Sequence, residues 1–531
     1  MERRWPLDAA RRTAIVAVCF AASLRAQTPD AFYNQGLAQA QQQHWDQART
    51  AFLAGQRANP SDARFPLELG GVAFKQKRNA EAAKWLRRAL HRDPSDTYTA
   101  EFLATVYFLE GNLDAALKYW NPIGKPHITA LAIPPSLRVD PILLDHAFRF
   151  SPAATLQLSD LRATRARLDA LGIFPSYRIR LDAQNDQQFS ARFDAAERNG
   201  FGSGKLNALV STFRGIGYQA IRPEYYNLAN ASVNVESLLR WDSNKRRGSV
   251  SVSGPLRRDA RYRYHACVDV RDENWNLQNP ASKPLGSLHM RRVASSAAIS
   301  SAGNGLWSWT AGGEFSHRNP RDIQPWPAAP ASTLVKAFQL KQSAQLRRTL
   351  LVLPEHRFTS SALLSTDVAK LWTAPSRVFS RVQLTLDSLW LPRISGEDYA
   401  THLQTRAGKI FGQAPFDELF MLGMERDNDL WLRAHVGSRD GRKGSAPLGQ
   451  RYFAATWDVD KILYDNGLLS LRLSPFFDVG SMDSSVGLGS RKWLFDTGLQ
   501  AKVRILGVGF AFIYGKDLRT GNNVFYIVEG R

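Results

Sequence analysis

LSLRLSPFFDVG, residues 469–480, is the stretch that decides the fold, because its side chains alternate in character. A β-strand points successive side chains to opposite faces, so one face of this segment is apolar and the other is polar. The apolar face carries Leu469, Leu471 and Leu473, and the polar face carries Ser470, Arg472, Ser474, Phe476, Asp478 and Gly480. Taken alone, one such strand favours a half-exposed strand of a soluble sandwich.

Segments of this kind recur from about residue 204 to the end of the chain, and their succession predicts a membrane barrel instead. They lie near 205–213, 231–240, 247–254, 262–271, 286–300, 306–316, 333–344, 358–372, 379–390, 398–411, 451–464, 468–482, 492–505, 507–516 and 522–529. With a further strand near 218–226 they approach about sixteen, and most have the roughly 9–11 residues that a tilted strand needs to cross a bilayer. Residues 200–531 are therefore predicted to form a transmembrane antiparallel β-barrel.

Six tryptophans of this region have two interpretations. They could form the aromatic girdles that lie at the level of the lipid head groups, or each could anchor a protein core. These residues are Trp307, Trp309, Trp372, Trp390, Trp457 and Trp493.

FFDVG at residues 476–480 resembles the Phe-x-Asp-x-Gly strand motif of the outer-membrane assembly and secretion family, which includes the BamA, TamA and two-partner-secretion transporters. LRAH at residues 432–435 resembles the loop motif of that family, Val-Arg-Gly followed by an aromatic residue, although Ala434 replaces the glycine and His435 the aromatic residue. In the family the loop folds back into the barrel lumen and its arginine pairs with the strand aspartate. The resemblance thus implies a loop–wall lock between Arg433 and Asp478, with Phe476 and Gly480 in the strand motif.

Such a pair is physically reasonable, since a guanidinium can bind a carboxylate through two parallel hydrogen bonds. The segment Pro415–Gly449 is long enough to return into a lumen. An ordinary solvated loop arginine is the alternative. The final strands, with Phe525-Tyr526 near the end, also resemble the end of a family barrel, although this chain finishes Glu529-Gly530-Arg531.

Residues 29–120 contain a repeat of 34 residues. The phased positions are Gly36 and Gly70, Ala48, Ala82 and Ala116, and Pro60 and Pro94. This period and these residue types resemble tetratricopeptide repeats, in which each unit is a pair of helices that small residues allow to approach closely. The repeats would provide a concave surface that docks a periplasmic partner or client, or alternatively a spacer.

Between the repeats and the barrel we expect a Pro-rich linker, residues 121–141, and a small α+β domain, residues 142–199. The domain is expected to contain a strand at Ala147–Phe150, one helix that Gly172 ends, and two strands at Tyr177–Asp182 and Gln188–Ala195. The order of elements and the phrase LDALGIF at 168–174 resemble the polypeptide-transport-associated (POTRA) domain. Members of that family hold clients by adding a strand to a sheet edge, which we assign to Gln188–Ala195.

Residues 1–26 resemble a secretory signal peptide, with a basic start, a short apolar core and Ala26 before the cleavage point. Only two cysteines occur, Cys19 within that segment and Cys267, so the mature chain would form no internal disulfide and no cysteine-based metal site. The net charge of +21 is spread along the chain, which favours a basic barrel interior and lipid-facing loops over nucleic acid. The sequence offers no catalytic motif, cofactor loop or metal-ligand spacing.

Two functions fit these observations. The first is a non-enzymatic protein of a Gram-negative-type outer membrane, with its N-terminal domains in the periplasm, that inserts or translocates unfolded polypeptide clients. The second is a barrel-anchored repeat scaffold or a passive pore without translocase activity. An exported enzyme is disfavoured because the catalytic residues are missing.

Overall fold

The computed structural model describes residues 28–184, 188–202, 204–278, 284–324, 332–393, 395–483, 488–490, 492–505 and 508–530. The predicted signal peptide lies outside them. The chain divides into two compact units at Ile123, and each is described by itself. None of the helices in the described ranges is long and apolar enough to cross a membrane.

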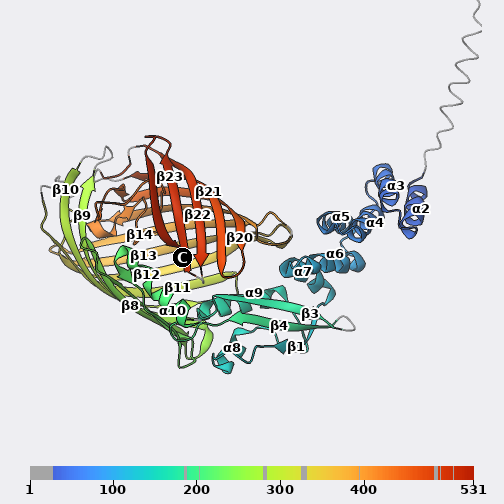
Figure 1. Ribbon diagram of the computed structural model, residues 1–531, viewed down its shortest axis with the longest axis horizontal. Coiled ribbons are helices and arrows are strands. Elements are labelled where there is room, and N and C mark those ends of the chain that lie inside the picture. The colour runs from blue at the N-terminus through green and yellow to red at the C-terminus, as the bar shows by residue number, and fades with distance from the viewer. Residues whose placement is uncertain are drawn as a thin grey trace, which may run out of the picture. The chain divides into compact units, whose positions relative to one another are not determined.

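The first unit is a series of helix pairs (Figure 1). Its helices are α2 (Pro29–Gln41), α3 (Trp45–Ala58), α4 (Arg64–Lys75), α5 (Asn79–Arg92), α6 (Thr97–Leu109) and α7 (Leu113–Trp120), followed by the short η1 (Asn121–Ile123). The three phased alanines are fully buried, and Pro60 and Pro94 lie in the turns after α3 and α5. Gly36 faces the ring of Phe52, and Gly70 faces Leu86, so each glycine admits a large residue of the partner helix.

The second unit begins with a small domain that contains a four-stranded sheet. Its elements are β1 (His127–Ala132), α8 (Pro141–Ala147), β2 (Ala154–Thr155), α9 (Leu158–Leu171), β3 (Ser176–Ala183) and β4 (Gln188–Ala196). The sheet order is β2-β1-β4-β3, with β1 parallel to β4 and β3 antiparallel to it. The buried faces of α8 and α9 supply much of the domain's core, including Leu144, Leu161 and Leu168.

Three expectations for this region were wrong. Residues 121–141 are not a linker throughout, because His127–Ala132 pairs with β4 as strand β1 of the small domain's sheet. Ala147–Phe150 is not a strand; Asp140 caps the helix α8 by accepting a hydrogen bond from the backbone of Ile142, and α8 continues to Ala147. Strand β4 is not an edge, since it lies between β1 and β3, and the open edge is β3.

The rest of the second unit is a closed antiparallel barrel (Figure 1). Its wall strands are β5 (Ala220–Ile221), β6 (Glu224–Leu228), β7 (Val233–Arg240), β8 (Lys245–Leu256), β9 (Asp259–Gln278), β10 (Pro284–Ser301), β11 (Trp307–Arg321), β12 (Ala337–Leu353), β13 (Phe358–Trp372), β14 (Arg377–Trp390), β15 (Tyr399–Gly412), β20 (Arg451–Asp465), β21 (Leu469–Asp483), β22 (Leu494–Ile505), β23 (Val508–Asp517) and β24 (Asn523–Gly530). Closure brings β24 beside β5. The predicted fold class, helical repeats followed by a large antiparallel barrel, is confirmed.

The barrel does not begin at residue 200. Residues 205–213, expected as the first strand, form helix α10 (Lys205–Phe213), which is followed by the short helix η3 (Ile216–Tyr218). The reason is visible in the spacing of Leu206, Leu209, Val210 and Phe213, which follows a helical period rather than strict alternation. The wall therefore starts at Ala220 with the two-residue strand β5.

The outer face of the wall is apolar, whereas the inner face carries both charged residues and apolar residues. Along β21 the positions of Ser474, Asp478 and Gly480 are buried, whereas Leu469 and Phe477 are exposed. All six tryptophans considered above are 39–49% exposed, so none of them anchors a core. So many exposed large apolar side chains are unusual for the surface of a water-soluble sheet protein.

Prediction for the helical unit. Gly70 and Gly71 are neighbours in α4, but an added Cβ would lie 2.7 Å from Leu86 at Gly70 and would meet nothing within 4 Å at Gly71. Replacing a helical glycine by alanine stabilises a helix by about 0.5–1 kcal/mol. We expect Gly71→Ala to show that gain and Gly70→Ala to lose about 1–3 kcal/mol through the clash. Urea unfolding of the full chain, followed by the helical signal at 222 nm, measures both; equal effects would contradict the packing.

Candidate functional site

The candidate site is the long loop between β15 and β20, residues 413–450, which we call the lumen loop. It contains η5 (Phe416–Glu418) and the two-residue strands β16 (Phe420–Met421), β17 (Ser438–Arg439), β18 (Arg442–Lys443) and β19 (Leu448–Gly449). Its apolar residues are buried against inward-facing side chains of the wall in one cluster; Phe416, Leu422 and Leu432 are at most 1% exposed. The loop thus occupies the barrel interior and packs there as a core.

The first polar contact between loop and wall is made by Asp417 and Glu418. Four cations from the strands β10, β11, β12 and β14 surround them: Arg292, Arg318, Lys341 and Arg381. The Lys341 Nζ atom lies 3.3 Å from Glu418 Oε1, and an Arg318 guanidinium nitrogen lies 3.0 Å from Asp417 Oδ1. Burial by itself would raise the pKa of Glu418, but the surrounding cations hold it well below its usual range. The loop carboxylates are therefore charged and balanced by the wall.

A second contact is centred on Asp427. Arg240 of β7 and Arg247 of β8 donate to its carboxylate at 2.8 and 2.6 Å. Lys443, also in the lumen loop, approaches it at 3.4 Å and donates to Glu273 of β9 at 2.6 Å. Burial favours the neutral acid, yet these three cations keep the pKa of Asp427 well below its usual range.

The third contact has the opposite polarity, because the loop supplies cations and the wall supplies carboxylates. The structure brings together all four residues of the predicted lock. Arg433 Nε donates to Asp478 Oδ2 at 2.8 Å and a second guanidinium nitrogen donates to Oδ1, which makes the pair bidentate. The guanidinium carbon lies 3.8 Å from the centroid of the Phe476 ring.

Gly480 completes this arrangement by leaving space. A Cβ atom at this position would lie 2.9 Å from a Leu422 methyl group and 3.0 Å from one of Leu432, which is closer than ordinary van der Waals contact. The three residues of the strand motif therefore act differently. The ring of Phe476 packs against the Arg433 guanidinium, and Asp478 binds it. Gly480 leaves room for Leu432, the residue that precedes Arg433 in the loop.

Asp478 belongs to a row of three aspartates that cross the inner wall in register. Asp478 of β21 pairs with Asp496 of β22, which pairs with Asp517 of β23. Like charges directly opposite one another in a sheet repel, and these three are almost completely buried. Arg433 balances the first aspartate, so the remaining two require a second cation.

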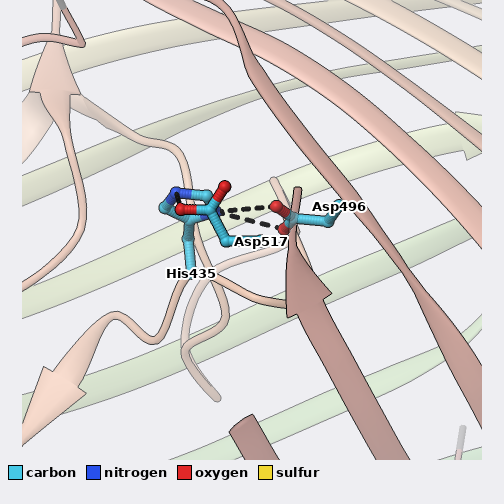
Figure 2. Close-up of side chains that lie close together, drawn as sticks. All are labelled: His435, Asp496 and Asp517. Atoms are coloured by element: carbon cyan, nitrogen blue, oxygen red, sulfur yellow. Dashed lines mark hydrogen bonds and ion pairs between the residues drawn. The ribbon is translucent and has the colours of Figure 1, made fainter. Parts of the chain in front are cut away.

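His435 supplies that cation (Figure 2). Its Nδ1 atom lies 3.0 Å from Asp496 Oδ1, and its Nε2 atom lies 3.7 Å from Asp517 Oδ2. The backbone amide of Ala434 also donates to Asp496 at 2.7 Å. Burial lowers the pKa of His435, but the hydrogen bond that its ring donates to Asp496 and the charges of both aspartates outweigh this effect and raise the pKa above its ordinary value. The imidazolium thus bridges two strands.

Sequence reasoning found one of the three contacts. Glu418, Asp427 and the two further aspartates of the row were missed, since their partners come from strands far away in the sequence. The signal that could have found Glu418 and Asp427 is the pair of acidic clusters in the loop, Asp417-Glu418 and Glu425 to Asp429.

The ligand atoms of His435, Asp496 and Asp517 lie within 4.8 Å of one another. However, the two ring nitrogens face different carboxylates, so a protonated imidazole accounts for the arrangement.

These features define a closed β-barrel that holds its own long loop, preceded by a small mixed domain and helical repeats. Residues 33–97 match the family model of the tetratricopeptide repeat, which confirms the predicted repeats over that range. No curated protein matches the chain.

The solved structures that are similar to this chain include the following three. BamA from Haemophilus ducreyi lacking POTRA domains 1–3 has 11% identity and a TM-score of 0.46, over 76% of this chain and 84% of that one. CdiB from Escherichia coli has 11% identity and a TM-score of 0.47, over 76% and 75%. CdiB from Acinetobacter baumannii has 9% identity and a TM-score of 0.44, over 74% and 70%.

Prediction for Arg433. Arg433→Ala leaves the carboxylate of Asp478 buried without its partner, which typically costs about 3–5 kcal/mol. The double variant Arg433→Ala/Asp478→Asn should recover part of this loss, because it removes the fully buried carboxylate; Asp458, which also contacts Arg433 and is 20% exposed, keeps its charge. The matched control is Arg451→Ala, since Arg451 pairs with Asp483 and both side chains are more than 60% exposed; such pairs contribute about 0–1 kcal/mol. Urea unfolding in lipid vesicles measures all three variants; equal losses for Arg433→Ala and Arg451→Ala would contradict the buried pair.

Prediction for His435. Because the pKa of His435 is raised in the folded state, its charge stabilises the fold below the ordinary pKa of 6.5, and this contribution is lost as the pH rises through the folded value. The unfolding midpoints of the wild type and His435→Gln should therefore differ more at about pH 6 than at about pH 9. A difference that is independent of pH would mean that His435 is not the titrating bridge.

Proposed function

We propose that this protein resides in an outer membrane of the Gram-negative type and inserts or translocates polypeptide clients. The observation that carries the proposal is the bidentate contact between Arg433 in the lumen loop and Asp478 on the wall. It joins the two sequence motifs on which the resemblance to the assembly and secretion family rests. The mechanism we propose is non-covalent and uses no cofactor.

The outer face of the barrel supports a membrane location. Large apolar side chains are exposed on many wall strands, among them Val268, Phe315, Leu364, Leu403 and Phe477. Their burial in lipid would be favourable, whereas in water they would form a large apolar surface. The buried charged side chains of the wall, among them Arg318 and Asp478, lie on the inner face.

The small domain supports a client-binding role on the periplasmic side. Helix α9 and the strands β3 and β4 follow one another as we expected for a POTRA-like domain. The domain is joined to the barrel by hydrogen bonds from Arg263 of β9 and Ser232 to the carbonyl oxygen of Leu171. We assign client contact to the open edge β3, because a free edge can accept an added strand. The tetratricopeptide repeats would dock a further partner or the client itself.

The closing seam supports a route for clients at the barrel wall. Strand β5 has two residues, whereas β24 has eight. Strand β5 can therefore form hydrogen bonds with only part of the backbone of β24. We propose that clients engage this seam while the lumen loop keeps the interior filled. The alternative of a passive pore is disfavoured by the apolar cluster and the ion pairs that hold the loop inside.

Prediction for the function. In cells that depend on the variant, Arg433→Ala should reduce the assembly or secretion of a subset of outer-membrane or exported proteins, while Arg451→Ala, which removes an exposed ion pair between two wall strands, should not. Quantitative mass spectrometry of the outer-membrane and secreted fractions measures client output, and the heat-dependent gel mobility of the barrel controls for folding.

Deleting residues 29–120 separates the two roles of the repeats: loss of client output indicates client handling, and retained output indicates an adaptor. Unchanged client output after depletion of the whole protein would exclude the proposed function.

A further inference from the structure

An apolar groove lies at the closing seam, outside the barrel wall. Helices α10 and η3 form one side of it and strands β23 and β24 form the other. Its volume is about 930 Å³. The apolar residues that line it include Leu209, Val210, Phe213, Ile216, Phe512 and Ile527.

The strand side of the groove belongs to the outer face of the wall. In β23 the side chains of Ala511 and Ile513 are buried, and Phe512, between them, is exposed. In β24 Ile527 is exposed, while its neighbour Val528 is buried. The groove is therefore continuous with the apolar outer face that we assign to the membrane.

The helical side is held in place by polar contacts to the barrel. Tyr218 Oη donates to the carbonyl oxygen of Ile527 at 2.5 Å, and Arg214 pairs with Glu224 of β6 at 2.6 Å. These contacts leave apolar side chains of the helices facing outward: Leu209 is 57% exposed, Phe213 46% and Ile216 54%. A short helix with such a face is suited to the membrane interface, where its apolar residues enter the acyl region.

We propose that this groove binds an acyl chain of a membrane phospholipid at the seam between β24 and β5. The inference rests on the proposed membrane location. A hydrocarbon chain needs no hydrogen-bonding partner, and the groove offers mostly apolar side chains. An extended polypeptide would need backbone partners, but on the α10 side the backbone groups of a helix bond within the helix. Removing these side chains from water by covering them with hydrocarbon is favourable.

Two glycines provide a matched test. Gly217 lines the groove, and an added Cβ there meets nothing within 4 Å, so Gly217→Trp can fill the groove without a backbone clash. An added Cβ at Gly248 in β8 also meets nothing within 4 Å. Its neighbour Arg247 points inward to Asp427, so position 248 faces outward. Gly248→Trp therefore places the same side chain on the outer wall, away from the seam. Both variants and the wild type are purified as full chains from membranes in mild detergent, and native mass spectrometry counts the phospholipid that each retains.

We expect one retained phospholipid in the wild type and in Gly248→Trp, and its loss in Gly217→Trp. Equal retention in all three, no retention in the wild type, or a bound peptide in place of lipid would overturn the inference. If Gly217→Trp does not fold, Leu209→Glu on the exposed face of α10 replaces it, with the same expected loss. Flotation with liposomes tests the membrane location separately. A wild-type barrel that floats with liposomes but retains no phospholipid would contradict the lipid site and leave the membrane location intact.

Discussion

The structure depends on the neutralisation of charge inside a closed wall. Three aspartates, Asp478, Asp496 and Asp517, lie side by side on adjacent strands in a space from which water is largely excluded. Such a row is unfavourable unless cations reach it. Arg433 and His435, two residues apart in one loop, meet that need. The acidic row therefore constrains where the lumen loop can be.

The opposite arrangement on the other side of the barrel makes the constraint stronger. There the wall carries the excess cations, and Glu418 and Asp427 in the loop carry the balancing carboxylates. A loop displaced from the lumen would leave both signs of charge uncompensated at once, and it would also expose the apolar cluster around Leu422 and Leu432. For this reason we regard the filled lumen as the resting state and the short seam at β5 as the more yielding part of the wall.

The sequence was sufficient for the architecture but not for all of the site. Period-2 alternation predicted the barrel, and a 34-residue period predicted the helix pairs, because both patterns are local consequences of backbone geometry. The pair Arg433–Asp478 followed from a motif resemblance. The partners of Glu418 and His435 depend on strand register across the barrel, which local patterns do not specify. The prediction of a strand at residues 205–213 was wrong because the apolar residues there follow a helical period. The prediction of β4 as an edge strand was wrong because its position inside the sheet depends on strand β1, which is distant in the sequence.

Hydrogen–deuterium exchange of the full chain tests the central claim most directly. The backbone amides of Arg433 and Ala434 lie outside helices and strands, yet they donate to the buried carboxylates of Asp478 and Asp496. If the lumen loop is held on the acidic row, these two amides exchange as slowly as those of the neighbouring wall strands β21 and β22. Exchange at the rate of a solvated loop would contradict the account.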